Sequence, residues 1–318
     1  MSALRKRVGS FLVDGFFQGT SRVAKLHPLA RPSRHGVEVL TDIPYGDANR
    51  REHLCDIYRP GGADAKTPLP VVLYVHGGGF RILSKDSHWV MALMFARRGY
   101  LTVSINYRLA PRDPFPAALE DCALAWAWIA RNIEAYGGDP SRVVLAGESA
   151  GANLVTAMTI AATCERPEPF AARIFETGLV PKATLAACGI LQVSDSARFG
   201  RRRSLPPWIL DRLVEVETSY LPAAARTSGF ELADPLVVLE RGVAPARALP
   251  PFFVPCGTKD PILDDSRRLA TVLTSLGVKN ELRVYTGEPH AFHAFVWRKN
   301  AQAHWRDTYR FLESTLAG

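Results

Sequence analysis

Gly147-Glu148-Ser149-Ala150-Gly151 is the segment whose residue types and spacing most clearly indicate chemistry. Residues 142–146 before it have the β-branched pattern of a short buried strand, and residues 152–158 after it are typical of a helix. A serine on such a strand-to-helix turn is held in a strained backbone conformation with its hydroxyl exposed, and small residues at 147 and 151 let strand and helix approach closely. The pentapeptide alone could be an ordinary tight turn. With these flanks it predicts that Ser149 is a nucleophile.

A serine hydroxyl needs a base to take its proton, and the base needs a partner that fixes its tautomer. When the serine lies on such a turn, an acid and then a histidine follow it along the chain, each in a loop after a strand. Asp260, Asp264 and Asp265 are candidates for the acid. Asp260 directly follows an apolar strand, whereas Asp264 is better placed as a helix N-cap. The same loop-after-strand argument favours His290 over His293 as the base.

Three successive glycines, Gly77-Gly78-Gly79, follow a continuous apolar run at residues 71–75. A loop of this kind exposes backbone N–H groups at a strand end, which is what an oxyanion hole requires. A flexible glycine turn is the alternative, and the serine segment makes it less favoured. We expect His76, just before the glycines, to be a structural histidine that hydrogen-bonds the loop.

The elements that must position these residues alternate between strands and helices. An antiparallel edge pair is expected at residues 37–40 and 54–58. Further strands are expected at 71–75, 101–105, 142–146, 183–190, 251–257 and 281–285, and helices at 87–98, 117–136, 152–158, 264–276 and 301–316, with Pro167 and Pro169 breaking the pattern. Continuous apolar strands are typical of a parallel sheet covered on both faces.

Two segments do not fit this alternation. Residues 1 to about 30 place Phe11, Phe16 and Phe17 on one stripe of an amphipathic helix, and residues 194–233 form a long insertion. We expect the two segments together to form a cap. Attachment of the N-terminal helix to a membrane is the less favoured alternative.

Composition excludes several classes of protein. The chain has 318 residues, of which 47% are hydrophobic and 22% charged, as in ordinary globular proteins, and one large sheet can account for the whole length. The net charge of +8 comes from dispersed basic residues without a nucleic-acid-binding module, so nucleic acid is not expected as a partner. Five cysteines without a C-x-x-C pair indicate reduced core residues of a cytoplasmic protein. No stretch approaches the ~20 apolar residues of a membrane span.

Several motifs together make the chain, from about residue 71 to the end, resemble the hormone-sensitive-lipase-like (family IV) esterases of the α/β-hydrolase superfamily. These motifs are His76-Gly77-Gly78-Gly79-Phe80, Tyr107-Arg108-Leu109-Ala110-Pro111 with Phe115-Pro116-Ala117, the serine pentapeptide, Asp260-Pro261 and His290-Ala291-Phe292. The resemblance implies an α/β-hydrolase fold with a mostly parallel eight-stranded sheet flanked by helices. It also implies a single domain over residues 1–318 with cap segments at about 1–35 and 195–233.

The resemblance also assigns roles to site residues. Ser149 is implied as the nucleophile, His290 as the base and Asp260 as its partner. The oxyanion hole is implied to consist of the backbone N–H groups of Gly78, Gly79 and Ala150. No metal or organic cofactor is expected.

The expected reaction is hydrolysis of short- to medium-chain acyl esters of small molecules through an acyl-serine intermediate. Phe16, Phe80 and Trp208 are expected to line the substrate pocket. Amide hydrolysis, as in deacetylases, and longer-chain lipase activity use the same groups and stay open, as does a homodimer. A catalytically silent ligand-binding protein is less favoured because all three groups of the triad are present.

The chain departs from the family pattern at a few positions. Arg112-Asp113 replaces a frequent Glu-His pair, Glu148 stands where Asp or Thr is more common, and Ala291 replaces a frequent glycine. These departures bear on subfamily and substrate range rather than on the reaction.

Overall fold

The computed structural model describes Gly19, Lys25 and residues 27–62, 67–202, 204–223 and 229–317. The expectations for Phe11, Phe16 and Phe17, and for most of the N-terminal cap segment, lie outside the described residues.

Eight strands form one sheet with the order β1-β2-β4-β3-β5-β6-β7-β8. They are β1 (Val37–Pro44), β2 (Leu54–Pro60), β3 (Leu69–Val75), β4 (Leu101–Ile105), β5 (Gly138–Glu148), β6 (Ala183–Ala187), β7 (Phe252–Gly257) and β8 (Asn280–Tyr285). β2 pairs antiparallel with both β1 and β4, and all other neighbours are parallel. The expected eight-stranded, mostly parallel sheet of the α/β-hydrolase fold is therefore confirmed.

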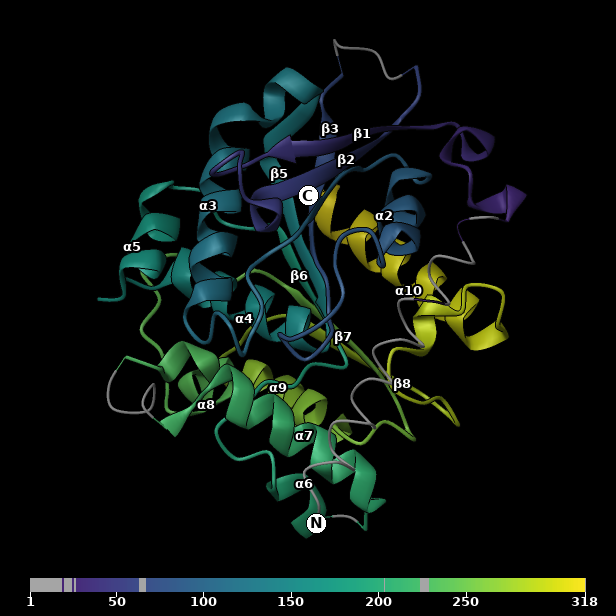
Figure 1. The fold of residues 1–318 in the computed structure, drawn as a ribbon. Helices are drawn as coiled ribbons and strands as arrows, with labels where there is room; N and C mark the ends of the chain where they lie inside the picture. The colour runs from purple at the N-terminus through teal and green to yellow at the C-terminus, as the bar shows by residue number, and fades with distance from the viewer. Residues whose placement is uncertain are drawn as a thin grey trace.

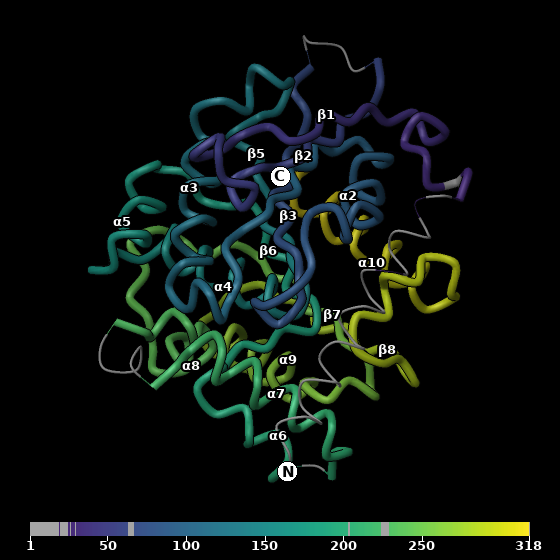
Figure 2. Tube along the Cα trace, in the orientation of Figure 1, coloured from purple at the N-terminus to yellow at the C-terminus, as the bar shows by residue number. Residues whose placement is uncertain are grey.

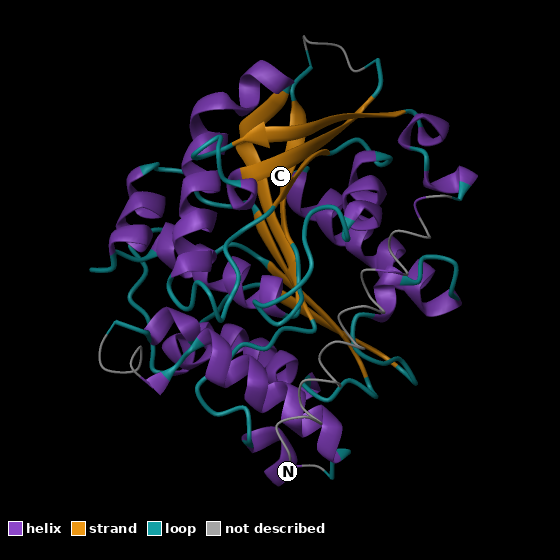
Figure 3. Cartoon of the chain, in the orientation of Figure 1, coloured by secondary structure: helices purple, strands orange, loops and turns teal. Residues whose placement is uncertain are grey.

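Helices cover both faces of this sheet (Figures 1 and 3). They are α2 (Trp89–Ala96), α3 (Ala117–Asn132), α4 (Ala150–Thr163), α5 (Pro169–Glu176), α6 (Arg198–Arg202), α7 (Pro207–Tyr220), α8 (Pro235–Glu240), α9 (Leu263–Ser275) and α10 (Lys299–Leu316). α2 and α10 lie on one side of the sheet, and α3, α4 and α9 lie on the other (Figure 1). Within the described ranges, no helix combines the length and apolarity that crossing a bilayer requires.

The central strand β3 shows why its sequence is apolar throughout. Val71, Leu73 and Val75 belong to the core cluster formed with α3, α4 and α9, whereas Val72 and Tyr74 belong to the cluster formed with α2 and α10. Successive side chains of a strand point to opposite faces, and here both faces are covered. The carboxyl ends of the parallel strands lie at one edge of the sheet, where the loops that carry the candidate site residues begin.

The insertion between β6 and β7 contributes α6, α7 and α8, which lie together at one end of the molecule (Figure 2). Phe199, Tyr220 and Leu232 from this segment are fully buried and belong to the same hydrophobic core as the sheet. The insertion is therefore attached to the sheet by apolar packing.

Some element boundaries differ from the expectations. Pro169 does not end regular structure but begins α5, because proline lacks an N–H and has a fixed φ that suits the first turn of a helix. The strand expected at residues 183–190 stops at Ala187, and Cys188 has a φ of +39°. α3 stops at Asn132 and continues as a 3₁₀ turn, Ile133–Tyr136, until Gly137 takes a left-handed conformation.

Candidate active site

Ser149 lies between β5 and α4 with φ +54° and ψ −116°, a strained conformation that costs about 1–3 kcal/mol. The two flanking glycines make this turn sterically feasible. A Cβ on Gly147 would lie 2.5 Å from backbone atoms of Gly151, and a Cβ on Gly151 would overlap the carbonyl oxygen of Val75. The amide of Ser149 donates to Ala187 O at 2.9 Å, which ties the turn to the neighbouring strand. The strand-turn-helix context expected from the pentapeptide is present.

His290 connects Ser149 to Asp260. Its Nε2 lies 3.0 Å from Ser149 Oγ, and its Nδ1 lies 2.8 Å from Asp260 Oδ2. In the neutral histidine, the serine hydroxyl donates to Nε2 and Nδ1–H donates to the carboxylate, which is the arrangement a serine nucleophile needs. Asp260 is fully buried, and its other oxygen accepts a hydrogen bond from Ile262 N at 3.0 Å. These three side chains, which lie far apart in the sequence, are brought together as expected.

The charge of Asp260 is the largest influence that raises the basicity of His290. Burial acts to lower the pKa of His290, but the adjacent carboxylate outweighs it and raises that pKa well above its ordinary value. The imidazole therefore accepts a proton from Ser149 more readily than a free histidine does.

The glycine loop has the backbone conformation that only glycine adopts without strain. Gly78 has φ +109° and Gly79 has φ +59°. A Cβ on Gly78 would overlap Ile82 O, and a Cβ on Gly79 would lie 2.7 Å from a methyl group of Val216 in α7. Ala150 is the first residue of α4, so its N–H is among those without a partner inside the helix and lies at the positive end of the helix dipole.

His76 has the structural role expected from its position. Its Nδ1 donates to Gly77 O at 2.7 Å, and the Tyr107 hydroxyl donates to His76 O at 2.9 Å. Burial and the neighbouring His88 lower the pKa of His76 to about 3. His76 is therefore neutral and hydrogen-bonded to the loop that it precedes.

The three residues expected to line the substrate pocket differ in their exposure to solvent and in whether the structure describes them. Phe80 is fully buried, and its ring stacks on Tyr220 with centroids 3.7 Å apart, so its packing does not support a position in the pocket wall. It joins the glycine loop to α7 instead. Trp208 at the start of α7 is 59% exposed, and its contact with substrate stays a prediction. Phe16 lies outside the described residues.

Sequence reasoning missed Cys188, which lies in the loop after β6. Its sulfur and single ligand atoms of Asp260 and His290 all lie within 4.8 Å of one another. Sulfur, imidazole and carboxylate are ligands that zinc accepts. However, Asp260 and His290 already bind each other, and burial raises the pKa of the Cys188 thiol, which keeps it protonated. The sequence held no clear signal for it, because the strand was expected to continue to residue 190 and its end at Ala187 is visible only in the structure.

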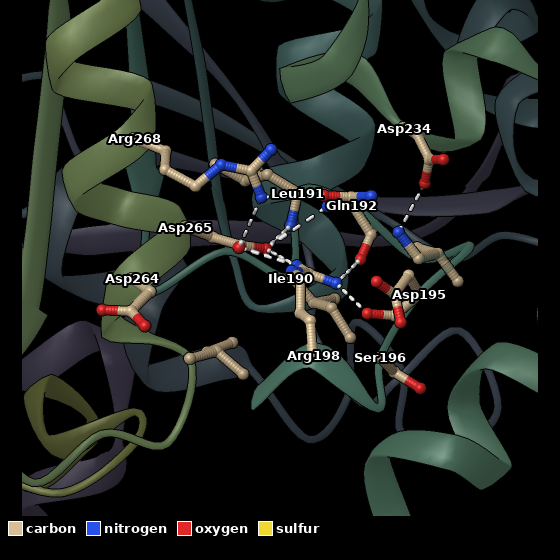
Figure 4. Close-up of polar contacts among 12 residues, drawn as sticks. Ile190, Leu191, Gln192, Asp195, Ser196, Arg198, Asp234, Asp264, Asp265 and Arg268 are labelled. Carbon is tan, nitrogen blue, oxygen red and sulfur yellow. Dashed lines mark hydrogen bonds and ion pairs between the residues drawn. The ribbon is translucent and has the colours of Figure 1, made fainter. Parts of the chain in front are cut away.

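A buried ion pair fixes the loop between β6 and α6 (Figure 4). Arg198 in α6 reaches both carboxylate oxygens of Asp265 in α9, at 2.6 and 2.5 Å, and also donates to Gln192 O at 2.7 Å. Asp265 accepts a further hydrogen bond from Leu191 N at 2.8 Å. Burial raises the pKa of Asp265, and the two charges are stabilised by each other and by these backbone groups. The insertion is thereby joined to the helix that follows the Asp260 loop.

The expectation that Asp264 caps α9 is wrong. The N-cap of α9 is Ile262, which makes no side-chain cap hydrogen bond, and Asp264 is the second residue of the helix. Its side chain points away from the Arg198–Asp265 pair (Figure 4). Asp260 Oδ1 accepts a hydrogen bond from Ile262 N, which fixes the turn just before α9.

The fold and this geometry define a serine hydrolase: a strained serine at a strand-helix turn, a histidine and a buried aspartate hydrogen-bonded in series, and a glycine loop beside them. A family model described as alpha/beta hydrolase fold matches residues 72–294. Carboxylesterase NlhH of Mycobacterium tuberculosis is 33% identical over 265 residues, which cover 82% of this chain and 73% of that protein.

Solved structures agree with the family match. Esterase LipW from Mycobacterium marinum superimposes with a TM-score of 0.76 at 26% identity, covering 97% of this chain and 90% of that one. An esterase from the bacterial hormone-sensitive lipase family gives 0.68 at 26% identity, with 88% and 85% covered. The chain belongs to the hormone-sensitive-lipase-like carboxylesterases of the α/β-hydrolase fold family.

Proposed function

We propose that this carboxylic ester hydrolase uses Ser149, His290 and Asp260 to cleave short- to medium-chain acyl esters of small molecules. The observation that carries the proposal is the continuous hydrogen-bonded series from Ser149 Oγ through His290 to the buried carboxylate of Asp260. Membership of a family of carboxylesterases supports the reaction type.

The geometry supports a two-stage acyl transfer. Ser149 Oγ attacks the ester carbonyl carbon while His290 Nε2 accepts its proton, and the N–H groups of Gly78, Gly79 and Ala150 donate to the oxygen that becomes negative. The C–O bond to the alcohol then breaks, and His290 returns the proton to the leaving oxygen. Water attacks the acyl-serine in the same way, which releases the acid and regenerates Ser149.

The packing of α7 supports the limited acyl length. Val216 of α7 lies against Gly79, and Arg81 in the glycine loop forms an ion pair with Glu215 of α7 at 2.7 Å. A cap helix packed this closely on the glycine loop leaves less room for a long chain than an open groove would. We also propose the cytoplasm as the location, because all five cysteines are buried and none forms a disulfide.

The test is hydrolysis of p-nitrophenyl esters from acetate to palmitate by the wild-type protein and by Ser149→Ala. We expect rates that peak at short or medium chains and that fall by on the order of 10⁶-fold in the variant. Ser314→Ala changes an exposed serine on α10 and should leave the rates unchanged. Equal rates for Ser149→Ala and wild type would show that the triad does not catalyse the hydrolysis. Faster turnover of a matched anilide than of the ester would reassign the activity to amide hydrolysis.

A further inference from the structure

Glu148, the residue before the nucleophile, is a buried carboxylate with three side-chain contacts. It ends β5 and is only 4% exposed. The Tyr74 hydroxyl donates to its Oε2, His88 Nε2 lies 2.5 Å from its Oε1, and His293 Nε2 lies 3.3 Å from its Oε2. Burying a carboxylate is costly unless it is paired and hydrogen-bonded, and these contacts meet both conditions.

The contacts of Glu148 come from the segments that carry the other catalytic groups. Tyr74 lies on β3, which runs into the glycine loop, and His88 lies between that loop and α2. His293 lies in the 3₁₀ helix η7 (Phe292–Ala294), three residues after His290. A Cβ on Gly77 would lie 3.2 Å from the Glu148 side chain, so the glycine loop rests directly on it. A single carboxylate thus contacts both segments that must be aligned with the serine.

The contacts with His88 and His293 keep Glu148 ionised. Burial acts to raise the pKa of Glu148, but His88 and His293 hold it well below its usual range. Burial likewise acts to lower the pKa of His88, and Glu148 outweighs this effect and raises it. The nearby rings of His76 and His304 have pKa values lowered first by burial and then by the adjacent histidines, so they stay neutral. The result is one buried ion pair, Glu148 with His88, beside a second histidine that donates to the same carboxylate.

We propose that Glu148 is a positioning residue. Its charge holds the His290 segment and the glycine loop in the correct position relative to Ser149. The inference rests on the proposed function of Ser149 and His290 and extends it to a residue that does not contact substrate. If the charge is removed, His88 is left buried without its anion and His293 loses its charged acceptor, so the contact between η7 and Glu148 is weakened. His290 moves with η7, because only two residues separate it from His293.

The variant Glu148→Gln keeps the shape of the side chain and removes its charge. A misplacement of about 1 Å can cost on the order of 10²-fold, so we expect kcat per active site to fall by roughly 10- to 100-fold with KM nearly unchanged. Active sites are counted by titration with an organophosphonate, which removes the contribution of unfolded protein. Glu134→Gln makes the same chemical change at an exposed position and should behave as wild type. Wild-type kcat per titrated site in Glu148→Gln would overturn the proposal.

A double-mutant cycle tests the link to the His290 segment. His293→Gln removes the other end of the contact, and its effect should not add to that of Glu148→Gln, because both changes break the same interaction. Fully additive losses would contradict the proposal. His293→Gln also provides the test on its own if Glu148→Gln does not fold.

A spectroscopic measurement separates this proposal from the proposed function. The proton between His290 Nδ1 and Asp260 gives a far-downfield NMR resonance that does not depend on ester turnover. We expect this resonance to shift or broaden in Glu148→Gln and not in Glu134→Gln. An unchanged resonance would overturn the positioning role, whereas a shifted resonance in a protein without esterase activity would leave the positioning role and reject the proposed function.

Discussion

The buried carboxylate of Asp260 contributes most to the basicity of His290. Because the raised pKa of His290 comes from Asp260 acting against burial, Asp260→Asn should lower that pKa. The base works only when neutral, so kcat/KM is retained above the pKa of His290 and lost as the pH falls through it. We therefore expect the acid limb of the pH profile to move to lower pH in Asp260→Asn, while the plateau falls by about 10⁴-fold. The measurement is kcat/KM for p-nitrophenyl butyrate as a function of pH.

Asp264→Asn is the control for this prediction. It makes the same carboxylate-to-amide change four residues away, on a side chain that points away from the buried ion pair of α9 (Figure 4). Its acid limb should coincide with that of the wild type. An acid limb that stays in place or moves to higher pH in Asp260→Asn would show that another group sets the pKa of the base.

The two glycines of the expected oxyanion hole should tolerate a methyl group differently. In Gly78→Ala the Cβ meets the backbone carbonyl of Ile82, which cannot move without reshaping the loop. In Gly79→Ala it meets a methyl group of Val216, whose removal by Val216→Ala relieves the contact. We expect Gly78→Ala to lower kcat by about 10²–10³-fold, the usual cost of losing one donor, with little rescue by Val216→Ala.

Gly79→Ala should lose less activity and should regain part of it when combined with Val216→Ala. For each glycine variant, with and without Val216→Ala, kcat is measured by steady-state kinetics on the purified protein. If Val216→Ala restored activity equally to both glycine variants, or restored it to neither, α7 would not be what restricts the loop at Gly79.

At the residue scale, sequence reasoning located the groups that follow a positional rule. Ser149, Asp260 and His290 each follow a strand in the parallel sheet, so local pattern and chain order were enough to select them. The contacts of Glu148 with His88 and His293 depend on side chains 60 and 145 positions away, respectively, as the residue numbers show, and no local pattern links them. The burial of Phe80 against Tyr220 was missed for the same reason.

At the scale of elements, the pair Arg198–Asp265 joins the insertion between β6 and β7 to α9. Breaking a buried ion pair by neutralising one partner leaves an uncompensated charge and typically costs about 3–5 kcal/mol. Asp265→Asn should therefore lower the free energy of unfolding by about that amount, measured by urea denaturation. The adjacent Asp264 is partly exposed, with ion pairs no closer than 3.8 Å, so Asp264→Asn should cost about 1 kcal/mol or less. Equal stabilities of the two variants would show that the Arg198–Asp265 contact contributes little.

The elements themselves were largely predictable, because strands buried on both faces have continuous apolar sequences. Residues 71–75 and 101–105 were recognised in this way and pair as β3 and β4. The exceptions are local conformations that tertiary contacts decide. Pro169 can either end or begin a helix, and only the packing of α5 against α3 and α4 settles which. Cys188 leaves the strand direction through a left-handed conformation that its residue type does not suggest.

At the scale of the whole molecule, one hydrophobic core extends from the sheet into the insertion between β6 and β7. Tyr220 at the end of α7 is fully buried, stacks on Phe80 from the glycine loop, and contacts Phe115 edge-on at 5.8 Å. Phe199 and Leu232 of the insertion belong to the same cluster as residues of β3, β4 and β5. Segments that share one core lose their contacts together, so we expect the described helices of the insertion and the sheet to unfold in one cooperative transition.

Tyr220→Ala tests this expectation. Truncating a large buried aromatic side chain costs about 3–5 kcal/mol, which for a chain of this size lowers the melting temperature by about 5–10 °C. Because the ring contacts the glycine loop and Phe115 as well as α7, the whole transition should move, and calorimetry, far-UV circular dichroism and residual esterase activity should report the same midpoint. If the insertion were an independent unit, a small early transition would separate from a main one that keeps its wild-type midpoint, and activity would disappear with the early transition. A shift of the whole transition would mean that the insertion moves away from the sheet only when the shared core unfolds. A separate early transition would mean that the insertion can open locally while the sheet stays folded.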